Sequence, residues 1–142
     1  MCHFRIYFFL LTFFTISFST TLIAQGCESV CLFFINGYAN TDNETKAARI
    51  LRQVWPNDYV SVATEILPEI REFERCSTAS LNAYLQPVVA NYLARLETRI
   101  AEDDAGSEIL IVQSNGGIMS VDTAKALPVR TALSGPAAGV VA

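Results

Sequence analysis

Residues 108–117 are Glu-Ile-Leu-Ile-Val-Gln-Ser-Asn-Gly-Gly, and this stretch decides the fold that we predict for the chain. Its four consecutive apolar residues, 109–112, are typical of a strand buried on both faces in the middle of a parallel sheet. Open α/β sheets place their ligands at the carboxyl ends of such strands. We therefore predict an α/β fold with a functional cleft at or near the loop after this strand.

The predicted ligand loop consists of the five residues that follow the strand: Gln113, Ser114, Asn115, Gly116 and Gly117. Ser114 and Asn115 offer short polar groups, and the glycines permit a positive φ and a close approach of the backbone. Ser, Asn and Gly are also the ordinary residues of turns. The same composition is therefore compatible with a plain turn from strand to helix.

The composition argues against nucleic-acid binding. The chain has 142 residues, enough for one domain of ordinary size, and a formal net charge of -4. A nucleic-acid-binding domain needs a basic patch, which this sequence lacks. The single histidine, His3, and the four cysteines have no zinc-site spacing, so we predict no metal among them and reduced thiols, with Cys31 a small buried hydrophobe.

The N-terminal leader, residues 1–25, stands apart from the rest of the chain. No charge follows Arg5 for about 20 residues, which is long enough to span a bilayer. Arg5 before an apolar run also resembles a secretory signal. A run of Phe, Leu, Ser and Thr that ends in Ala-Gln is also what a translated intron end would encode. Two interpretations of the leader therefore stay open: a secretory signal or membrane anchor, and an artefact of the gene model.

A βαβ unit is predicted from Ser29 to Ala63. Residues 29–35 form a strand candidate that is closed by Asn36-Gly37, and residues 59–63 form a second one. Between them, Thr41 and Glu44 have the spacing of a capping box at the start of a helix.

One long helix is predicted near residues 77–103. We expect its apolar stripe to face the sheet, with Pro87 bending the helix; the stripe consists of Leu81, Tyr84, Leu85, Val88, Val89, Tyr92, Leu93, Leu96 and Ile100. Before this helix, residues 65–75 carry four carboxylates and two arginines. Such a cluster holds a metal or supplies a base in some proteins, but the spacing favours a solvated connector with internal ion pairs.

Two further elements follow the loop. Ser120 is expected to cap a short helix that ends before Pro128, and residues 129–133 to form a short strand. Ser134 and Gly135 then begin a helix, whose N-terminus near the cleft is a candidate anion site. Gly135 and Gly139 equally favour close packing of this helix on a neighbour.

Several dispersed motifs resemble the hydantoinase/oxoprolinase family, the large ATP-dependent subunits related to N-methylhydantoinase, 5-oxoprolinase and acetone carboxylase. The resemblance extends from about Gly26 to the end of the chain. The motifs are Gly37-Tyr38-Ala39-Asn40, residues 65–75, Leu81-Asn82-Ala83-Tyr84, residues 113–117 and residues 133–140. The Gln-Ser-Asn-Gly-Gly form is closer to the hydantoinase and carboxylase branch than to the oxoprolinase branch.

The resemblance implies a fragment of an actin-like ATPase fold with a parallel or mixed sheet. Residues 26–64 would be the end of an N-terminal domain, and residues 65–142 the start of the ATPase domain. It also implies ATP-dependent opening of a cyclic amide of the hydantoin or 5-oxoproline class, or ketone carboxylation, through phosphorylation of a substrate oxygen with a divalent metal. A hydantoinase B-type subunit or domain would be the partner, in the cytoplasm.

The sequence departs from the family at the nucleotide site. Gly-Gly-Thr-type phosphate loops, expected near the N-terminus and after residues 134–139, are both missing. We therefore predict that the chain is inactive alone and takes up no ATP or metal. Two alternatives stay open: a membrane-anchored or secreted binding module, with the leader as anchor or signal, and a remnant without a stable function.

Overall fold

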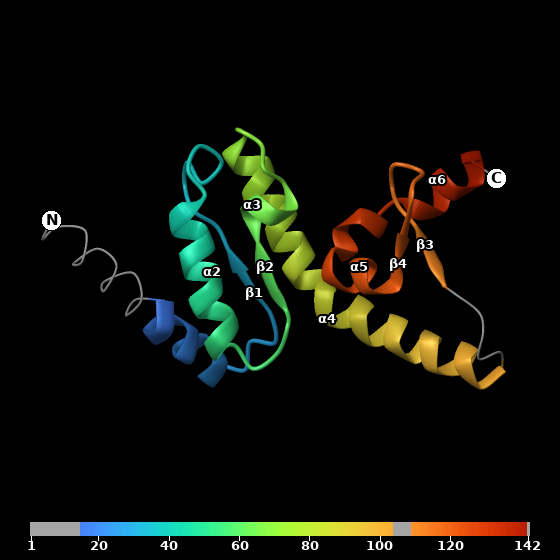
Figure 1. Ribbon diagram of the computed structural model, residues 1–142, viewed down its shortest axis with the longest axis horizontal. Helices are drawn as coiled ribbons and strands as arrows, with labels where there is room; N and C mark the ends of the chain where they lie inside the picture. The colour runs from blue at the N-terminus through green and yellow to red at the C-terminus, as the bar shows by residue number, and fades with distance from the viewer. Residues whose placement is uncertain (1–14, 104–108, 142) are drawn as a thin grey trace, which may run out of the picture. The chain divides into compact units, whose positions relative to one another are not determined.

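The computed structural model describes residues 15–103 and 109–141 (Figure 1). The chain divides between Ala83 and Tyr84 into two compact units, which we call unit 1 (residues 1–83) and unit 2 (residues 84–142). The boundary falls inside one long helix, α4 (Glu72–Asp103). The fold is α/β, as predicted, with mostly helical content and two small sheets.

Unit 1 contains the predicted βαβ unit. Strand β1 (Val30–Leu32) pairs in parallel with β2 (Val60–Val62), and helix α2 (Asp42–Val54) connects them. The register of the two strands places Cys31 opposite Ser61. The short helix α3 (Ala63–Ile66) directly follows β2. The prediction of two parallel strands joined by a helix is confirmed.

One hydrophobic cluster holds α2 against the parallel pair. Its buried residues are Ala48, Leu51, Trp55, Val60 and Val62. The described part of the leader, residues 15–24, is helical, and its Leu22 and Ile23 pack against this cluster. Gly26 ends that helix at a φ of 78°, and Cys27 N donates to Leu22 O at 3.2 Å, which together form a Schellman-type stop. Residues 1–14 lie outside the described residues.

Within the part of the chain that the structure describes, no helix is long and apolar enough to cross a membrane.

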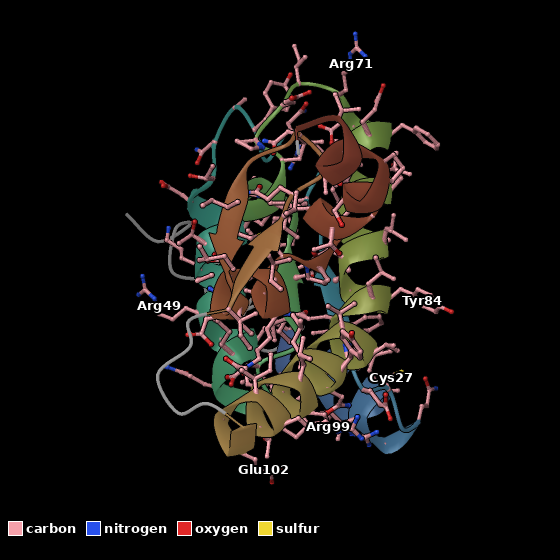
Figure 2. All side chains as sticks on the ribbon, turned by 90° about the vertical axis from the view of Figure 1, so that its right-hand side faces the viewer. Cys27, Arg49, Arg71, Tyr84, Arg99 and Glu102 are labelled. Atoms are coloured by element: carbon pink, nitrogen blue, oxygen red, sulfur yellow. The ribbon has the colours of Figure 1, made fainter. Side chains whose placement is uncertain are left out.

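The long helix was predicted in the correct region, but it begins at Glu72, and its predicted apolar stripe is partly wrong. Leu93 is buried, yet Leu81, Tyr84, Val88 and Tyr92 are 45–76% exposed. Figure 2 shows the Tyr84 side chain pointing away from the ribbon. The buried face instead carries small and polar residues, namely Ala79, Asn82, Ala83, Gln86 and Ala90. Asn82 is buried because its amide donates to Ser61 Oγ at 2.9 Å, which offsets the desolvation of both groups.

Unit 2 corrects the prediction of a central parallel strand. Strand β3 (Leu110–Val112) pairs in antiparallel fashion with β4 (Ile118–Ser120), so the Gln113–Gly117 loop is the turn of a β-hairpin. Leu110 is 50% exposed, so β3 is not buried on both faces. The hairpin packs through Met119 on Leu93, Val121 and Ala124. A two-stranded sheet needs such support from a helix.

The elements after the hairpin are helical. Ser120 caps α5 (Val121–Ala126) by accepting from Thr123 N at 3.3 Å, as predicted. The strand predicted over residues 129–133 is wrong: Pro128–Thr131 is a 3-10 helix, η1, which Pro128 favours at its first position through its fixed φ. Helix α6 (Ser134–Val141) begins where predicted.

Candidate functional site

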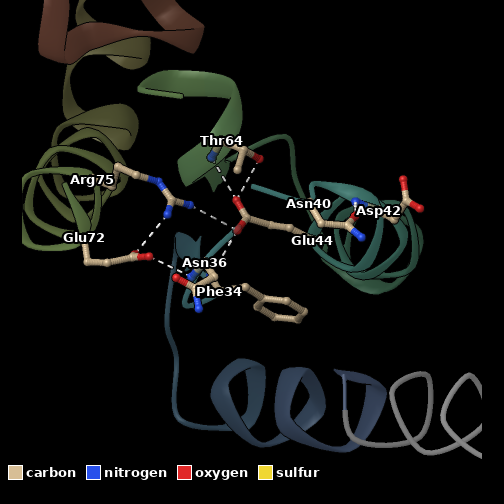
Figure 3. Close-up of polar contacts among 8 residues, drawn as sticks. All are labelled: Phe34, Asn36, Asn40, Asp42, Glu44, Thr64, Glu72 and Arg75. Atoms are coloured by element: carbon tan, nitrogen blue, oxygen red, sulfur yellow. Dashed lines mark hydrogen bonds and ion pairs between the residues drawn. The ribbon is translucent and has the colours of Figure 1, made fainter. Parts of the chain in front are cut away.

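Glu44 of α2 and Arg75 of α4 form a buried ion pair in unit 1. Both side chains are completely buried, with Arg75 Nη2 3.6 Å from Glu44 Oε2 (Figure 3). Arg75 Nη1 also pairs with Glu72 Oε2 at 2.9 Å. The three charges leave one net negative charge, and we call Glu44, Glu72 and Arg75 the charge cluster.

Glu44 is held by donors from two other segments. Its Oε1 accepts from Thr64 N and Thr64 Oγ1, both at 2.8 Å, and its Oε2 accepts from Phe34 N at 3.0 Å. The predicted capping box is therefore wrong: Thr41 makes no side-chain cap, and Glu44 turns inward to its four partners. At the start of α2, Asn40 Oδ1 instead accepts from Asp42 N at 2.9 Å (Figure 3).

The segment after β1 wraps around the cluster. Asn36 N donates to Glu72 Oε1 at 2.7 Å, and Asn36 itself has a positive φ of 59°. The Arg75 guanidinium lies 5.2 Å from the Phe33 ring centroid and 5.8 Å from that of Tyr38, both within cation–π range. The cluster thus ties residues 33–38 to α2, α3 and α4.

Gly37 has no room for a side chain. A Cβ at this position would lie 2.6 Å from Glu44 Oε2 and 2.9 Å from Arg75 Nη2. Both distances are shorter than non-bonded contacts allow, and the two groups are buried and held by other partners. The Glu44–Arg75 ion pair therefore requires glycine at position 37.

The cluster positions a loop and does not itself offer a reactive group. Glu44 is fully buried and each of its oxygens already has partners, so no substrate reaches it. Among the described residues, no three His, Cys, Asp or Glu side chains gather as metal ligands. The prediction that residues 65–75 form a solvated connector with internal ion pairs is correct in part. The ion pairs Arg75–Glu72 and Arg71–Glu74 exist, but the Arg75 side chain is completely buried.

The sequence contained one weak signal for this cluster. Asn36-Gly37 marks a tight turn after a strand, and Glu44 follows on the first turn of the next helix. Nothing in the sequence shows that Arg75, 31 residues further along, meets that glutamate.

The predicted ligand loop is closed by its own hydrogen bonds. Gln113 N donates to Gly117 O at 2.7 Å, and Gly116 has a φ of 84°, which favours glycine. Asn115 Oδ1 accepts from Gly117 N at 3.0 Å.

Ser114 connects the loop to the segment before α6. Its Oγ donates to Arg130 O at 2.8 Å and accepts from Leu133 N at 3.2 Å. The side chains of Ser114 and Asn115 are exposed while they make these bonds. The assignment of residues 113–117 as a ligand loop stays a prediction.

The second candidate, the N-terminus of α6, lies directly after this contact. A Cβ on Gly135 or Gly139 would meet no atom within 4 Å, so these glycines make no close packing with the described residues. Ser134 and Gly135 therefore remain candidates for an anion site or for packing on another part of a larger protein.

Comparison with known proteins identifies the chain's relatives. The family model described as "Hydantoinase/oxoprolinase" matches residues 75–142. Residues 75–142 belong to the hydantoinase/oxoprolinase family. The similarity extends beyond this range, because relatives align with 80–84% of the chain.

Three relatives illustrate the match. An uncharacterized protein of Methanocaldococcus jannaschii is 37% identical over 115 residues, which are 81% of this chain and 17% of that protein. The caprolactamase subunit alpha of Pseudomonas jessenii is 33% identical over 113 residues, 80% of this chain and 16% of the relative. The 5-oxoprolinase of Saccharomyces cerevisiae is 34% identical over 122 residues, 84% of this chain and 9% of the relative.

The chain thus spans less than a fifth of the length of these relatives. No solved structure matches it significantly.

Substitutions in the hairpin turn test whether residues 113–117 are a ligand loop or only a turn. They are made in a full-length member of the hydantoinase/oxoprolinase family. At the position that matches Asn115, alanine is expected to lower turnover while costing about 1 kcal/mol of stability or less, since one exposed hydrogen bond is lost. Gly116→Ala should lower both, through strain of about 1 kcal/mol or more at positive φ. Turnover and thermal unfolding are measured on the same preparations. An Asn115→Ala variant with normal turnover and reduced stability would show that the loop is only a turn.

Proposed function

We propose that the chain is part of an ATP-dependent enzyme that opens cyclic amides of the hydantoin or 5-oxoproline class. The observation that supports this proposal is the similarity of 80–84% of the chain to caprolactamase subunit alpha and 5-oxoprolinase. Both names refer to enzymes for cyclic amides. The family match over residues 75–142 agrees with this assignment.

The proposal assigns the nucleotide chemistry to other parts of a larger protein. The described residues contain no group of three metal-binding side chains, and the sequence contains no glycine-rich phosphate loop. We therefore propose that ATP and its metal bind to other parts of the larger protein, and we expect this chain to be inactive alone. This chain would contribute a βαβ unit fixed by the charge cluster, and a hairpin turn next to α6 that remains the candidate ligand loop.

The larger protein would have an actin-like ATPase fold. In it, residues 26–64 would end an N-terminal domain and residues 65–142 would begin the ATPase domain. One relative is named as a subunit, which supports a multi-subunit assembly, and we propose a hydantoinase B-type subunit as the partner. The proposed location is the cytoplasm.

An exchange of segments tests this proposal. In caprolactamase subunit alpha, the 113 matched residues are replaced by the corresponding segment of this chain. With the remaining subunits, the exchanged enzyme is expected to hydrolyse caprolactam with ATP at a rate within about tenfold of the parent, a loss of about 1.4 kcal/mol or less. Omission of ATP is the control. An exchanged subunit that assembles and melts like the parent but has no activity would contradict the proposal.

A ketone carboxylase subunit is the second candidate, because the Gln-Ser-Asn-Gly-Gly form of the loop resembles that branch as well. The same segment placed in a carboxylase subunit distinguishes the two. The host enzyme in which the exchange preserves more of the activity indicates the branch.

A further inference from the structure

Two cysteines of unit 1 lie on the same side of the parallel pair. In β1, Val30 and Leu32 pack against the cluster that contains α2, so Cys31 between them points to the opposite face. On that face, Ser80 Oγ of α4 lies 4.0 Å from Cys31 Sγ. Cys31 and Cys76 are both free thiols of intermediate burial.

Helix geometry brings Cys76 to the same place. Cys76 precedes Ser80 by four residues, so the two side chains share one side of α4. Cys76 also follows Arg75, whose guanidinium lies 5.2 Å from the Phe33 ring. Phe33 directly follows β1 and is two residues after Cys31. Residues 75–80 of α4 thus run alongside residues 31–33, and Cys76 lies between the two measured contacts.

The electrostatics of Cys31 agree with this placement. Burial raises the pKa of the Cys31 thiol, the Ser80 hydrogen bond lowers it, and the nearby Cys76 thiol and Glu44 carboxylate raise it. These directions are consistent with the placement of Cys76 that follows from the helix geometry. Cys27, in contrast, packs against the cluster on the α2 side of the sheet.

We propose that Cys31 and Cys76 are a redox-sensitive pair that a small disulfide, such as oxidised glutathione, converts into an intramolecular disulfide between β1 and α4. This bond would close a loop of about 45 residues that includes α2, β2 and α3, and such a loop restricts the unfolded chain strongly. It would also fix α4 beside the charge cluster.

The reaction is an ordinary thiol–disulfide exchange in two steps. One protein thiolate attacks a sulfur of the small disulfide, which forms a mixed disulfide and releases one small thiolate. The other protein thiolate attacks the protein sulfur of the mixed disulfide and releases the second. The two cysteines lose two electrons and two protons in total, and the small disulfide is reduced to two thiols.

Peptide mapping without reduction tests the pair. The purified, reduced chain is incubated with oxidised glutathione, and the linked peptides are identified by mass spectrometry. We expect a Cys31–Cys76 link in the native chain and in Cys27→Ser, but not in Cys31→Ser or Cys76→Ser. In the native chain and in Cys27→Ser, oxidation should raise the melting temperature by about 5 °C or more. The melting temperature of each oxidised variant is compared with that of its own reduced form, so that differences in stability between variants do not affect the result.

Oxidation in concentrated urea is the matched control. In the unfolded chain, closure favours cysteines that are closer in sequence, such as Cys27 with Cys31, so the Cys31–Cys76 link should no longer predominate. Three results would overturn the proposal: glutathione adducts on both cysteines in buffer without a link, a link in buffer that involves Cys27, or the same pattern of links in urea as in buffer.

Discussion

Arg75→Met is expected to destabilise unit 1 by about 3–5 kcal/mol, because it leaves Glu44 as a buried carboxylate without its counter-ion. Methionine retains much of the apolar stem, so the loss arises mainly from the charge. The free energy of unfolding is measured by urea denaturation of the full chain, monitored by circular dichroism.

Arg71→Met is the matched control for this prediction. Arg71 lies four residues earlier, its side chain is 70% exposed, and it pairs with Glu74 at 3.5 Å. Its replacement should change stability by less than about 0.5 kcal/mol. Equal effects of the two substitutions would show that the buried ion pair does not stabilise the fold.

Gly37→Ala is expected to cost about 3 kcal/mol, although it adds a single methyl group. The new Cβ would lie 2.6 Å from Glu44 Oε2, so either the glutamate must leave Thr64 and Phe34 or the loop must move. We expect a lower urea midpoint, measured in the same assay.

Gly139→Ala supplies the comparison, because a Cβ there would meet no atom within 4 Å. In the interior of α6, alanine should be neutral or should stabilise the helix by up to about 1 kcal/mol. A Gly37→Ala variant as stable as the native chain would mean that the cluster tolerates displacement and does not fix the loop.

Local signals in the sequence predicted several elements correctly. The βαβ unit followed from two apolar segments separated by a helical pattern, and the α5 cap followed from Ser120. Each strand, the helix and the cap was predicted from residues that are close together in the sequence. Local patterns of this kind are what a sequence shows directly.

Strand β3 was wrongly predicted to lie in a parallel sheet, because the sequence of a strand does not show which strand it pairs with. A short apolar segment such as residues 109–112 suits a buried parallel strand and a hairpin strand equally well. The decisive features lie elsewhere: Gly116 at positive φ reverses the chain, and Ser114 bonds to Arg130 and Leu133. The loop remains a candidate site, and the hydrogen bonds described for it join its residues to one another and to Arg130 and Leu133.

Buried polar residues explain the other errors. Asn82 and Gln86 do not belong to the predicted apolar stripe of the long helix, yet both are buried, with Asn82 bonded to Ser61 and Gln86 to Ala126. Glu44 has the spacing of a cap, yet it is an internal acceptor. The cost of burying a polar group depends on partners that are distant in sequence, and a hydrophobic pattern does not contain them.

Our central proposal is that this chain is a folded part of a hydantoinase/oxoprolinase-type enzyme whose nucleotide site lies in other parts of the larger protein. Calorimetric titration of the purified chain with ATP and Mg²⁺, after cooperative unfolding has been verified, tests it most directly. The account predicts a cooperative transition and no heat of binding. A dissociation constant in the micromolar range, about -8 kcal/mol, would contradict it.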